Sequence, residues 1–194
     1  MRLAILLSGR GSNFEAIYRA NVAQIVCVIS NRPDAPGIAR ARELGLTAHV
    51  FDHRNYPTRE AHEEDVLRAI AEAEPDFIAL AGYMRLLSPA FVAAYPHRIL
   101  NIHPSLLPAF PGVDAQAQAL RYGVRVSGCT VHFVDENLDA GPIIVQRAVT
   151  VLDGDTADSL AARILEQEHI AYVEALVALS SRKWRVEGRR VVFG

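Results

Sequence analysis

Strand-like apolar runs alternate with helix-like segments through the first hundred residues, and this alternation constrains the fold more than any other feature of the sequence. The expected strands are residues 2–7, 24–30, 47–51, 77–81 and 99–102, and the expected helices are residues 13–19, 37–44, 58–73 and 89–95. Strands that alternate with helices form parallel sheets with helices on both faces. We therefore predict an α/β fold of the Rossmann-like, doubly wound type, which binds ligands beyond the carboxyl ends of its strands.

The second half of the chain has a different pattern. The expected elements are two longer strands at residues 126–134 and 143–151, a long amphipathic helix at residues 156–179 with Asp155 or Thr156 as its N-cap, and a terminal hairpin at residues 184–193 that turns at Glu187-Gly188. The longer strands predict a sheet that is mixed but mostly parallel. Because 194 residues suit one compact domain and no repeat or linker interrupts them, we predict a single domain over residues 1–194.

The balance of charge excludes several classes of protein. The chain has 20 basic and 22 acidic residues, interspersed, and a formal net charge of −2, which argues against a nucleic-acid surface. No apolar run approaches the roughly 18 residues of a membrane span, and no secretory signal is recognisable, so we expect a cytoplasmic protein. Cys27 and Cys129 sit in apolar, β-branched runs and are expected to be buried, reduced thiols. These features favour a small-molecule substrate.

A glycine-containing loop, Ser-Gly-Arg-Gly-Ser-Asn at residues 8–13, joins the first expected strand to the first helix. Glycines let the backbone approach a ligand, and the N–H groups at a helix start attract an anion. Ser12 and Asn13 can cap the helix and hydrogen-bond a phosphate. A dinucleotide site needs a third glycine where Phe14 stands, and an acidic residue after the second strand. The loop therefore predicts a monophosphate site, with a tight turn and ordinary capping as the alternative.

Polar residues follow the fifth expected strand. Asn101 and His103 are two residues apart, so their side chains share one face of an extended chain. An amide beside an imidazole can stabilise a carbonyl oxygen as it becomes an oxyanion. Asp139 lies in a turn enclosed by apolar residues, where a carboxylate can hold a histidine charged or relay a proton from an amine. The alternatives are a structural histidine and a solvated acidic turn.

Three strings in this region resemble the folate-dependent formyltransferases. They are Asn-Ile-His-Pro-Ser-Leu-Leu-Pro at 101–108, Phe-Pro-Gly at 110–112 and Leu-Asp-Ala-Gly-Pro-Ile at 138–143, and with the glycine loop the resemblance covers Met1 to about Tyr172. The resemblance implies the formyltransferase fold and a direct transfer, through an oxyanion intermediate, of the formyl group of 10-formyltetrahydrofolate to the amine of glycinamide ribonucleotide in purine biosynthesis. The implied partners are these two small molecules, with no metal, nucleic acid or membrane, and a monomer or homodimer is expected.

The resemblance also implies roles for individual residues. It assigns catalysis to Asn101, His103 and Asp139, the ribonucleotide phosphate to Gly11, Ser12 and Asn13, its ribose to Glu168, and the folate to Arg59, Met84, Arg85, Leu86, Leu87, Asn101, Val134, Asp135, Leu138 and Asp139. The N-terminal half would thus bind the ribonucleotide, and the C-terminal half would bind folate and carry the chemistry. Packing at a helix entry is the alternative for residues 84–87. Asp114-Ala115-Gln116 and Leu165 depart from the family pattern, which concerns fine substrate contacts.

Other functions compete with this interpretation. Within formyl transfer, the alternatives are a formyltransferase with another acceptor and a formyltetrahydrofolate hydrolase. A formyltransferase acting on transfer RNA would need a basic C-terminal domain in addition. A nicotinamide-dependent oxidoreductase is disfavoured by the missing third glycine and ribose acid. A catalytically silent nucleotide-binding module would not need Asn101, His103 and Asp139 together.

Overall fold

The computed structural model describes residues 1–194, which form two compact units, Met1–Leu100 and Asn101–Gly194. The prediction of a single domain concerns how these units join, and it stays a prediction. None of the helices combines the length and the apolar character that crossing a bilayer requires.

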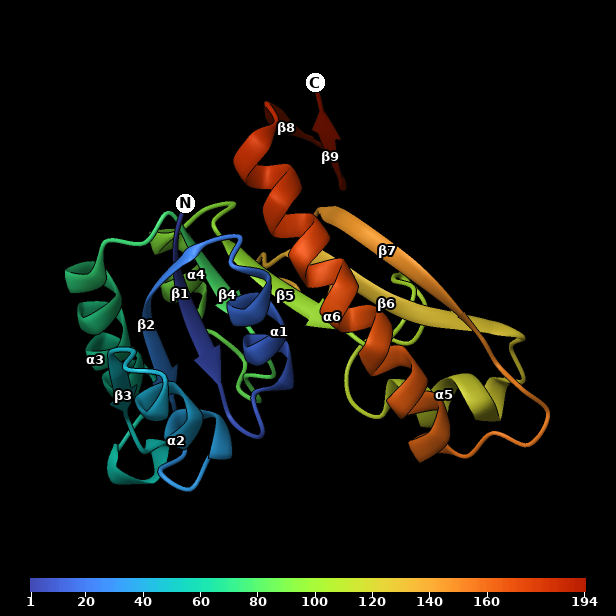
Figure 1. Ribbon diagram of the computed structural model, residues 1–194, viewed down its shortest axis with the longest axis horizontal. Coiled ribbons are helices and arrows are strands. Elements are labelled where there is room, and N and C mark those ends of the chain that lie inside the picture. The colour runs from blue at the N-terminus through green and yellow to red at the C-terminus, as the bar shows by residue number, and fades with distance from the viewer. The chain divides into compact units, whose positions relative to one another are not determined.

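The first unit is a parallel sheet covered by helices (Figure 1). Its elements are β1 (Arg2–Leu7), α1 (Ser12–Ala20), β2 (Gln24–Ser30), α2 (Pro36–Glu43), β3 (Ala48–Val50), the short 3-10 helix η1 (His53–Asn55), α3 (Arg59–Ala73), β4 (Phe77–Leu80) and α4 (Pro89–Ala94), and β5 (Ile99–His103) leads into the second unit. The strand order is β3-β2-β1-β4, with every pair parallel. Because the chain moves outward from β1 to β3 and then returns to β4, right-handed crossovers place α1 and α2 on one face and α3 on the other. The predicted doubly wound arrangement is confirmed.

The central strand of this unit explains why its sequence is a continuous apolar run. β1 pairs with β2 on one side and β4 on the other, and residues 3–7 are completely buried. A strand that is covered on both faces cannot alternate apolar and polar residues, since neither face meets water. β4 has the same pattern, with all four of its residues buried. The core of the first unit therefore lies along β1 and β4.

The start of α1 corrects one expectation. Ser12 and Asn13 do not cap this helix, because they are its first two residues and the N-cap is Gly11. Gly11 has a φ of 80°, in the left-handed region that favours glycine, and a Cβ there would lie 3.0 Å from the Cα of Gly37. The tight turn is therefore made by the glycine backbone, and the helix begins one residue earlier than the serine–asparagine pattern suggested.

The second unit contains the longer strands. Its elements are α5 (Ala115–Tyr122), β6 (Val126–Phe133), β7 (Ile143–Thr150), α6 (Ala157–Ser181), β8 (Trp184–Glu187) and β9 (Arg190–Phe193). β6 and β7 are antiparallel, β9 is parallel to β7, and β8 is antiparallel to β9. α6 packs across β6 and β7 (Figure 1). The mixed, mostly parallel α/β sheet is therefore as predicted.

The boundaries in this unit agree with the sequence patterns in part. Thr156 caps α6, because its side chain accepts the Ser159 N–H while the Ser159 side chain accepts the Thr156 N–H. The terminal hairpin is confirmed, but its turn falls at Gly188 and Arg189, one residue later than predicted. α5 was not predicted, because a short helix rich in alanine and glutamine has too little apolar periodicity to distinguish it from a loop.

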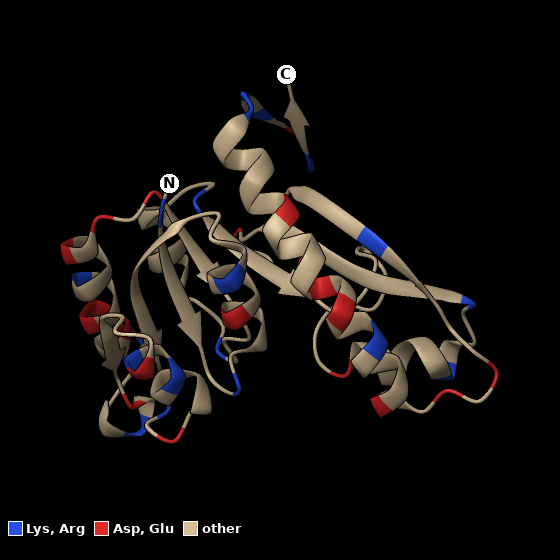
Figure 2. Cartoon of the chain, in the orientation of Figure 1, with Lys and Arg blue, Asp and Glu red and all other residues tan.

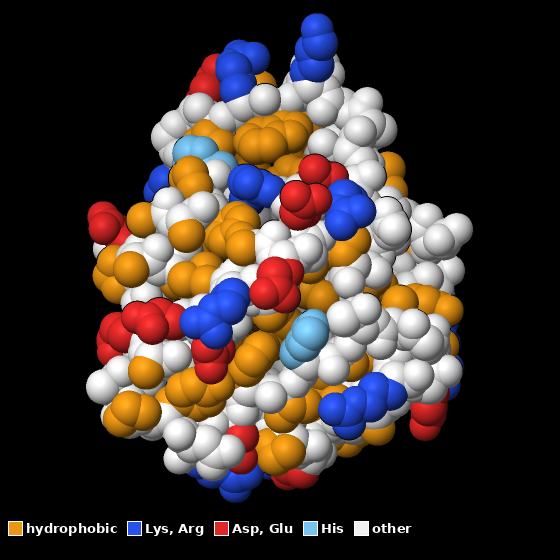
Figure 3. Space-filling view, turned by 90° about the vertical axis from the view of Figure 1, so that its left-hand side faces the viewer, with side chains coloured by type: hydrophobic (Ala, Val, Ile, Leu, Met, Phe, Trp, Pro, Cys, Tyr) orange, Lys and Arg blue, Asp and Glu red, His pale blue; other side chains and the backbone are white.

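The distribution of the charged side chains and the burial of the two cysteines agree with the sequence analysis. Acidic and basic residues are interspersed in both units (Figure 2), and on the face in Figure 3 they mix with apolar side chains without forming a continuous basic area. Cys27 and Cys129 are free and buried, as expected. Burial raises the pKa of the Cys27 thiol to about 11 and that of Cys129 to about 12, so both stay protonated at neutral pH.

Candidate active site

The three residues that were predicted to carry the chemistry lie together in the second unit. His103, at the end of β5, has its Nδ1 3.4 Å from Oδ2 of Asp139. Asn101 and Asp139 both reach His132 on β6, whose Nε2 lies 3.3 Å from the Asn101 amide nitrogen and 3.9 Å from Asp139 Oδ1. Sequence reasoning missed His132, which stands in an apolar strand with no neighbouring motif. We call Asn101, His103, His132 and Asp139 the polar cluster.

The contacts of His103 fix the orientation of its ring. Nε2 lies 2.8 Å from the carbonyl oxygen of Phe110, and because a carbonyl only accepts, Nε2 carries a proton. Nδ1 faces the Asp139 carboxylate, which also accepts the Gly112 N–H at 2.8 Å. Both ring nitrogens therefore face acceptors, and both side chains are more than 90% buried. The imidazole ring of His103 is therefore held between the Phe110 carbonyl and the Asp139 carboxylate.

The second histidine of the polar cluster, His132, is buried on β6. Burial lowers the pKa of His132, and this effect outweighs the attraction of Asp139 for its charged form. Its Nδ1 lies 2.9 Å from the Phe133 carbonyl oxygen and must donate, so Nε2 of the neutral ring accepts. The Asn101 side chain therefore presents its NH₂ group to His132, and one N–H of that amide stays available for another acceptor. A neutral histidine thus orients the amide that is predicted to bind an oxyanion.

The burial of His132 predicts an acid-sensitive contribution to stability. Its folded-state pKa lies below the unfolded value of about 6.5, so the unfolded chain takes up the proton first as the pH falls. We expect the free energy of unfolding to fall below pH 6.5, by at most about 1.4 kcal/mol per pH unit from this residue, with no effect above it. Urea unfolding of the wild type and of His132→Gln at several pH values measures this slope.

The free energy of unfolding of His132→Gln should fall less steeply between neutral and acid pH than that of the wild type. Ser180→Ala serves as the control, because Ser180 is exposed on α6 and does not titrate, and its slope should equal that of the wild type. Equal slopes for His132→Gln and the wild type would exclude His132 as the source.

The backbone around the cluster is strained. Phe110, Asp114 and Asp139 have φ values of 54°, 56° and 50°, in the left-handed region that residues other than glycine seldom occupy. Such conformations cost on the order of 1–3 kcal/mol each and occur mainly at functional sites. Gly141 fixes the Asp139 loop against β6, because a Cβ at this position would lie 1.8 Å from the carbonyl oxygen of Phe133. Three of the six non-glycine residues with a positive φ thus lie in the segments that surround the polar cluster, and the other three lie in the first unit.

A buried hydrogen-bond network holds the segment that follows His103. The Thr130 hydroxyl on β6 donates to the Ser105 carbonyl at 2.7 Å and accepts the Leu107 N–H at 3.0 Å. The Gln146 side chain on β7 donates to the Leu107 carbonyl at 2.8 Å. Two strands thus anchor this loop, which supports the Phe110 carbonyl opposite His103. These partners are far from residue 105 in sequence, so no local signal marks them.

The glycine loop occupies the carboxyl end of β1 in the first unit. Gly11 is buried at the start of α1, Ser12 is half-buried, and Asn13 is buried in the first helical turn. The first N–H groups of a helix have no intrahelical partner and attract anions. The geometry suits a phosphate, which agrees with the prediction but does not test it.

The segment after β4 is tied to the same edge of this unit. The Met84 N–H donates to the Ser8 hydroxyl at 2.8 Å, and that hydroxyl donates to the Asn31 side chain at 2.6 Å. Met84 and Leu86 are 76% and 64% exposed, so helix-entry packing does not account for them. A cavity of about 440 Å³ lies beside Met84 and is also lined by Ser8, Asn31 and Arg85. The apolar side chains of Met84 and Leu86 are therefore exposed and available to a ligand.

The remaining predicted residues are distributed over both units. Arg59 is the exposed first residue of α3, Arg85 and Leu87 are half-buried, Glu168 is buried on α6, Val134 and Asp135 are half-buried in the loop before Asp139, and Leu138 is 56% exposed in that loop. Of the departures from the family pattern, Asp114 is the N-cap of α5, Ala115 and Gln116 begin that helix, and Leu165 is half-buried on α6. These positions are consistent with binding roles, which stay predictions.

Comparisons with known proteins all identify formyltransferases as similar to this chain. A family model described as formyl transferase matches residues 1–176. The phosphoribosylglycinamide formyltransferase of Escherichia coli is 41% identical over 194 residues, which cover 97% of this chain and 89% of that protein. The trifunctional purine biosynthetic protein adenosine-3 of Drosophila pseudoobscura is 46% identical over 187 residues, but these are 93% of this chain and only 14% of that protein. The solved structure of glycinamide ribonucleotide transformylase 1 from Symbiobacterium toebii has a TM-score of 0.96 at 46% identity and covers 100% of this chain and 93% of that one.

Proposed function

The chain belongs to the formyl transferase family, and from this premise we propose that it transfers the formyl group of 10-formyltetrahydrofolate to the amine of glycinamide ribonucleotide. The observation that carries the proposal is the polar cluster, in which Asn101, His103 and Asp139 meet within hydrogen-bond or ion-pair distance of one another or of His132. The product would be formylglycinamide ribonucleotide, an intermediate of purine biosynthesis.

The proposed reaction is a direct acyl transfer. The amine attacks the formyl carbon, a new C–N bond forms, and the carbonyl oxygen becomes an oxyanion. The free amide N–H of Asn101 donates to this oxygen, while the imidazolium of His103 places a positive charge beside it. Asp139 stabilises that imidazolium and relays the proton of the amine to the folate nitrogen, whose bond to the formyl carbon then breaks. No covalent enzyme intermediate is required.

The proposed binding residues follow from the family resemblance. Gly11, Ser12 and Asn13 would hold the ribonucleotide phosphate, and Glu168 would hold its ribose. The folate would be bound by Arg59, residues 84–87 and the loop 134–139. A cytoplasmic location and a monomer or homodimer remain predictions.

Gly11→Val tests the phosphate assignment. The side chain would force a strained φ and contact the Gly37 backbone, so the loop that presents its N–H groups must shift. Loss of charge-assisted hydrogen bonds predicts a Kd for glycinamide ribonucleotide roughly 10- to 100-fold higher, with the Kd for the formyl folate changed less than about threefold. Calorimetric titration of each ligand measures both values.

A matched control is Gly154→Ala, since Gly154 has open space around its Cβ position and no positive φ. It should leave both dissociation constants unchanged. Equal weakening of both ligands by Gly11→Val would mean that the loop is structural rather than a phosphate site.

The overall reaction has a direct test. Purified protein is mixed with glycinamide ribonucleotide and 10-formyltetrahydrofolate, and conversion of the folate is followed by absorbance. Conversion only in the presence of the ribonucleotide supports the proposal. Conversion without it indicates a hydrolase, and no conversion in either mixture overturns the proposal and directs the search to other amine acceptors.

A further inference from the structure

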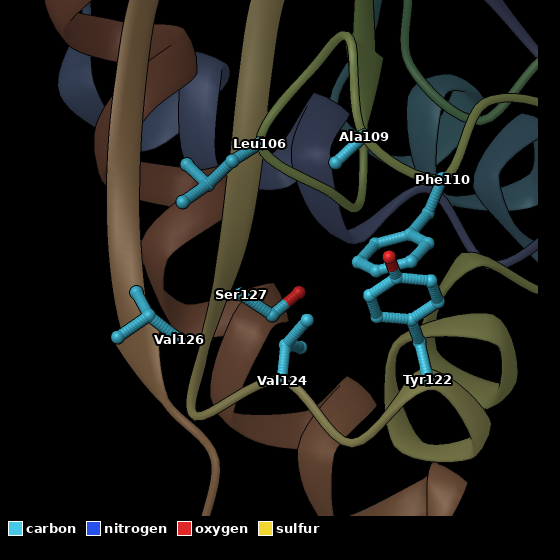
Figure 4. Close-up of a pocket in the computed structure, with 7 residues that line it drawn as sticks. All are labelled: Leu106, Ala109, Phe110, Tyr122, Val124, Val126 and Ser127. Carbon is cyan, nitrogen blue, oxygen red and sulfur yellow. The ribbon is translucent and has the colours of Figure 1, made fainter.

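The second unit contains a pocket that none of the assigned roles uses (Figure 4). It has a volume of about 440 Å³ and lies between the segment that follows His103 and the chain that leads from α5 into β6. Leu106, Ala109 and Phe110 line it from the first segment, and Tyr122, Val124, Val126 and Ser127 line it from the second. The volume falls within the range of about 300–1,000 Å³ that small-molecule sites occupy.

One polar group in this pocket has no partner within the protein. Ser127 is 2% exposed, and its hydroxyl makes no hydrogen bond. Figure 4 shows the Ser127 oxygen directed into the space between Val124 and Phe110. Buried hydroxyls in folded proteins nearly always have a hydrogen-bond partner, so this one requires an explanation. The oxygen itself is almost completely buried, so a ligand with a matching polar group in the pocket would become its partner when the Ser127 side chain rotates toward the cavity.

The rest of the lining defines the chemistry of the ligand. The rings of Phe110 and Tyr122 form an edge-type pair with centroids 5.8 Å apart, and Tyr122 is 81% exposed although it is a large aromatic residue. Aromatic walls favour an aromatic ligand through stacked or edge-to-face contacts. The lining contains no charged side chain, so a charged ligand would lose its hydration without compensation. We propose that this pocket binds a neutral aromatic small molecule with one hydrogen-bonding group, of the phenol class.

Phe110 connects this site with the polar cluster. Its ring lines the pocket, while its carbonyl oxygen accepts the hydrogen bond of His103 Nε2 at 2.8 Å. A ligand that contacts the ring therefore changes the environment of the His103 proton. This expected change can be measured without formyl transfer, by following the NMR signals of the His103 ring.

The test compares phenol with toluene, which has the same ring but lacks the hydroxyl. NMR titration of the full-length protein should give saturable shifts at residues 109–110 and 122–127 and at the His103 ring. Phenol should bind roughly three- to tenfold more tightly than toluene, as one net hydrogen bond provides. Shifts that do not saturate up to the solubility limit, or that map to another part of the chain, would overturn the proposal.

Variants separate the hydroxyl from the aromatic wall. Ser127→Ala should abolish the preference for phenol and leave toluene binding within about twofold, while Tyr122→Ala should weaken both ligands. Ser180→Ala is the matched control, because Ser180 is exposed on α6, and it should change neither. Without ligand, Ser127→Ala should melt at or above the wild-type temperature, since it removes an unsatisfied buried hydroxyl. A phenol preference that persists in Ser127→Ala, or a lower melting temperature, would contradict the assignment.

Discussion

Replacement of His103 by alanine is expected to lower turnover by about 10²–10³-fold while the chain remains folded. The substitution removes the imidazolium that would stabilise the oxyanion, and it leaves the Phe110 carbonyl and the Asp139 carboxylate without their shared partner. The Kd values of the substrates should change much less than kcat, because the charge of His103 acts mainly on the transition state. Steady-state kinetics and separate ligand titrations measure the two quantities.

Two controls distinguish a loss of catalysis in His103→Ala from a loss of folding or a general effect of removing a histidine. Circular dichroism and the melting temperature report whether His103→Ala retains its fold, since a cavity at a buried site also lowers stability. His49→Ala is the control for loss of a histidine, because His49 lies half-buried on β3 in the first unit, and its kcat should stay within about twofold of the wild type. A folded His103→Ala protein with wild-type turnover would exclude His103 from the chemistry.

Asp139→Asn should have an effect of similar or greater size, a loss on the order of 10³–10⁴ in kcat, as for other carboxylates that orient a catalytic histidine. The substitution keeps the shape of the side chain but removes its charge. The new amide can still accept the Gly112 N–H, but it no longer stabilises a protonated His103 and cannot relay a proton. Ligand binding should largely survive, so the loss appears in single-turnover kinetics.

Asp153→Asn provides the matched control in the same unit, since the Asp153 side chain is 86% exposed in the turn between β7 and α6. It should leave kcat unchanged within about twofold. If Asp139→Asn lowered only the affinity for the folate and left kcat intact, Asp139 would be a binding residue and the proton relay would need another group.

Local patterns predict much of this protein because their physical causes are local. The buried strands β1 and β4 are continuous apolar runs, and the cap of α6 was expected at Asp155 or Thr156, of which the structure selects Thr156. The alternation of strands and helices, with right-handed crossovers, then leaves few topologies for the first unit. The spacing of Asn101 and His103 on one strand likewise places both side chains on one face.

Long-range contacts decided what local patterns could not. His132 enters the polar cluster only because β6 brings it beside Asn101 and Asp139, 31 residues from Asn101 in the chain. The same holds for Thr130 and its contacts to the segment after His103. A buried polar side chain in an apolar strand has no local signature, because its partner is set by strand pairing.

Sequence patterns were sufficient to predict the fold class, most of the secondary structure and the residue types of the candidate site. Local patterns did not predict the hydrogen-bond partners of His103, the neutral form of His132, α5 or the pocket at Ser127, which became visible only in the folded structure. The physical reason is that protonation and cavities depend on burial and on the partners around each group, which are set by segments far apart in the chain.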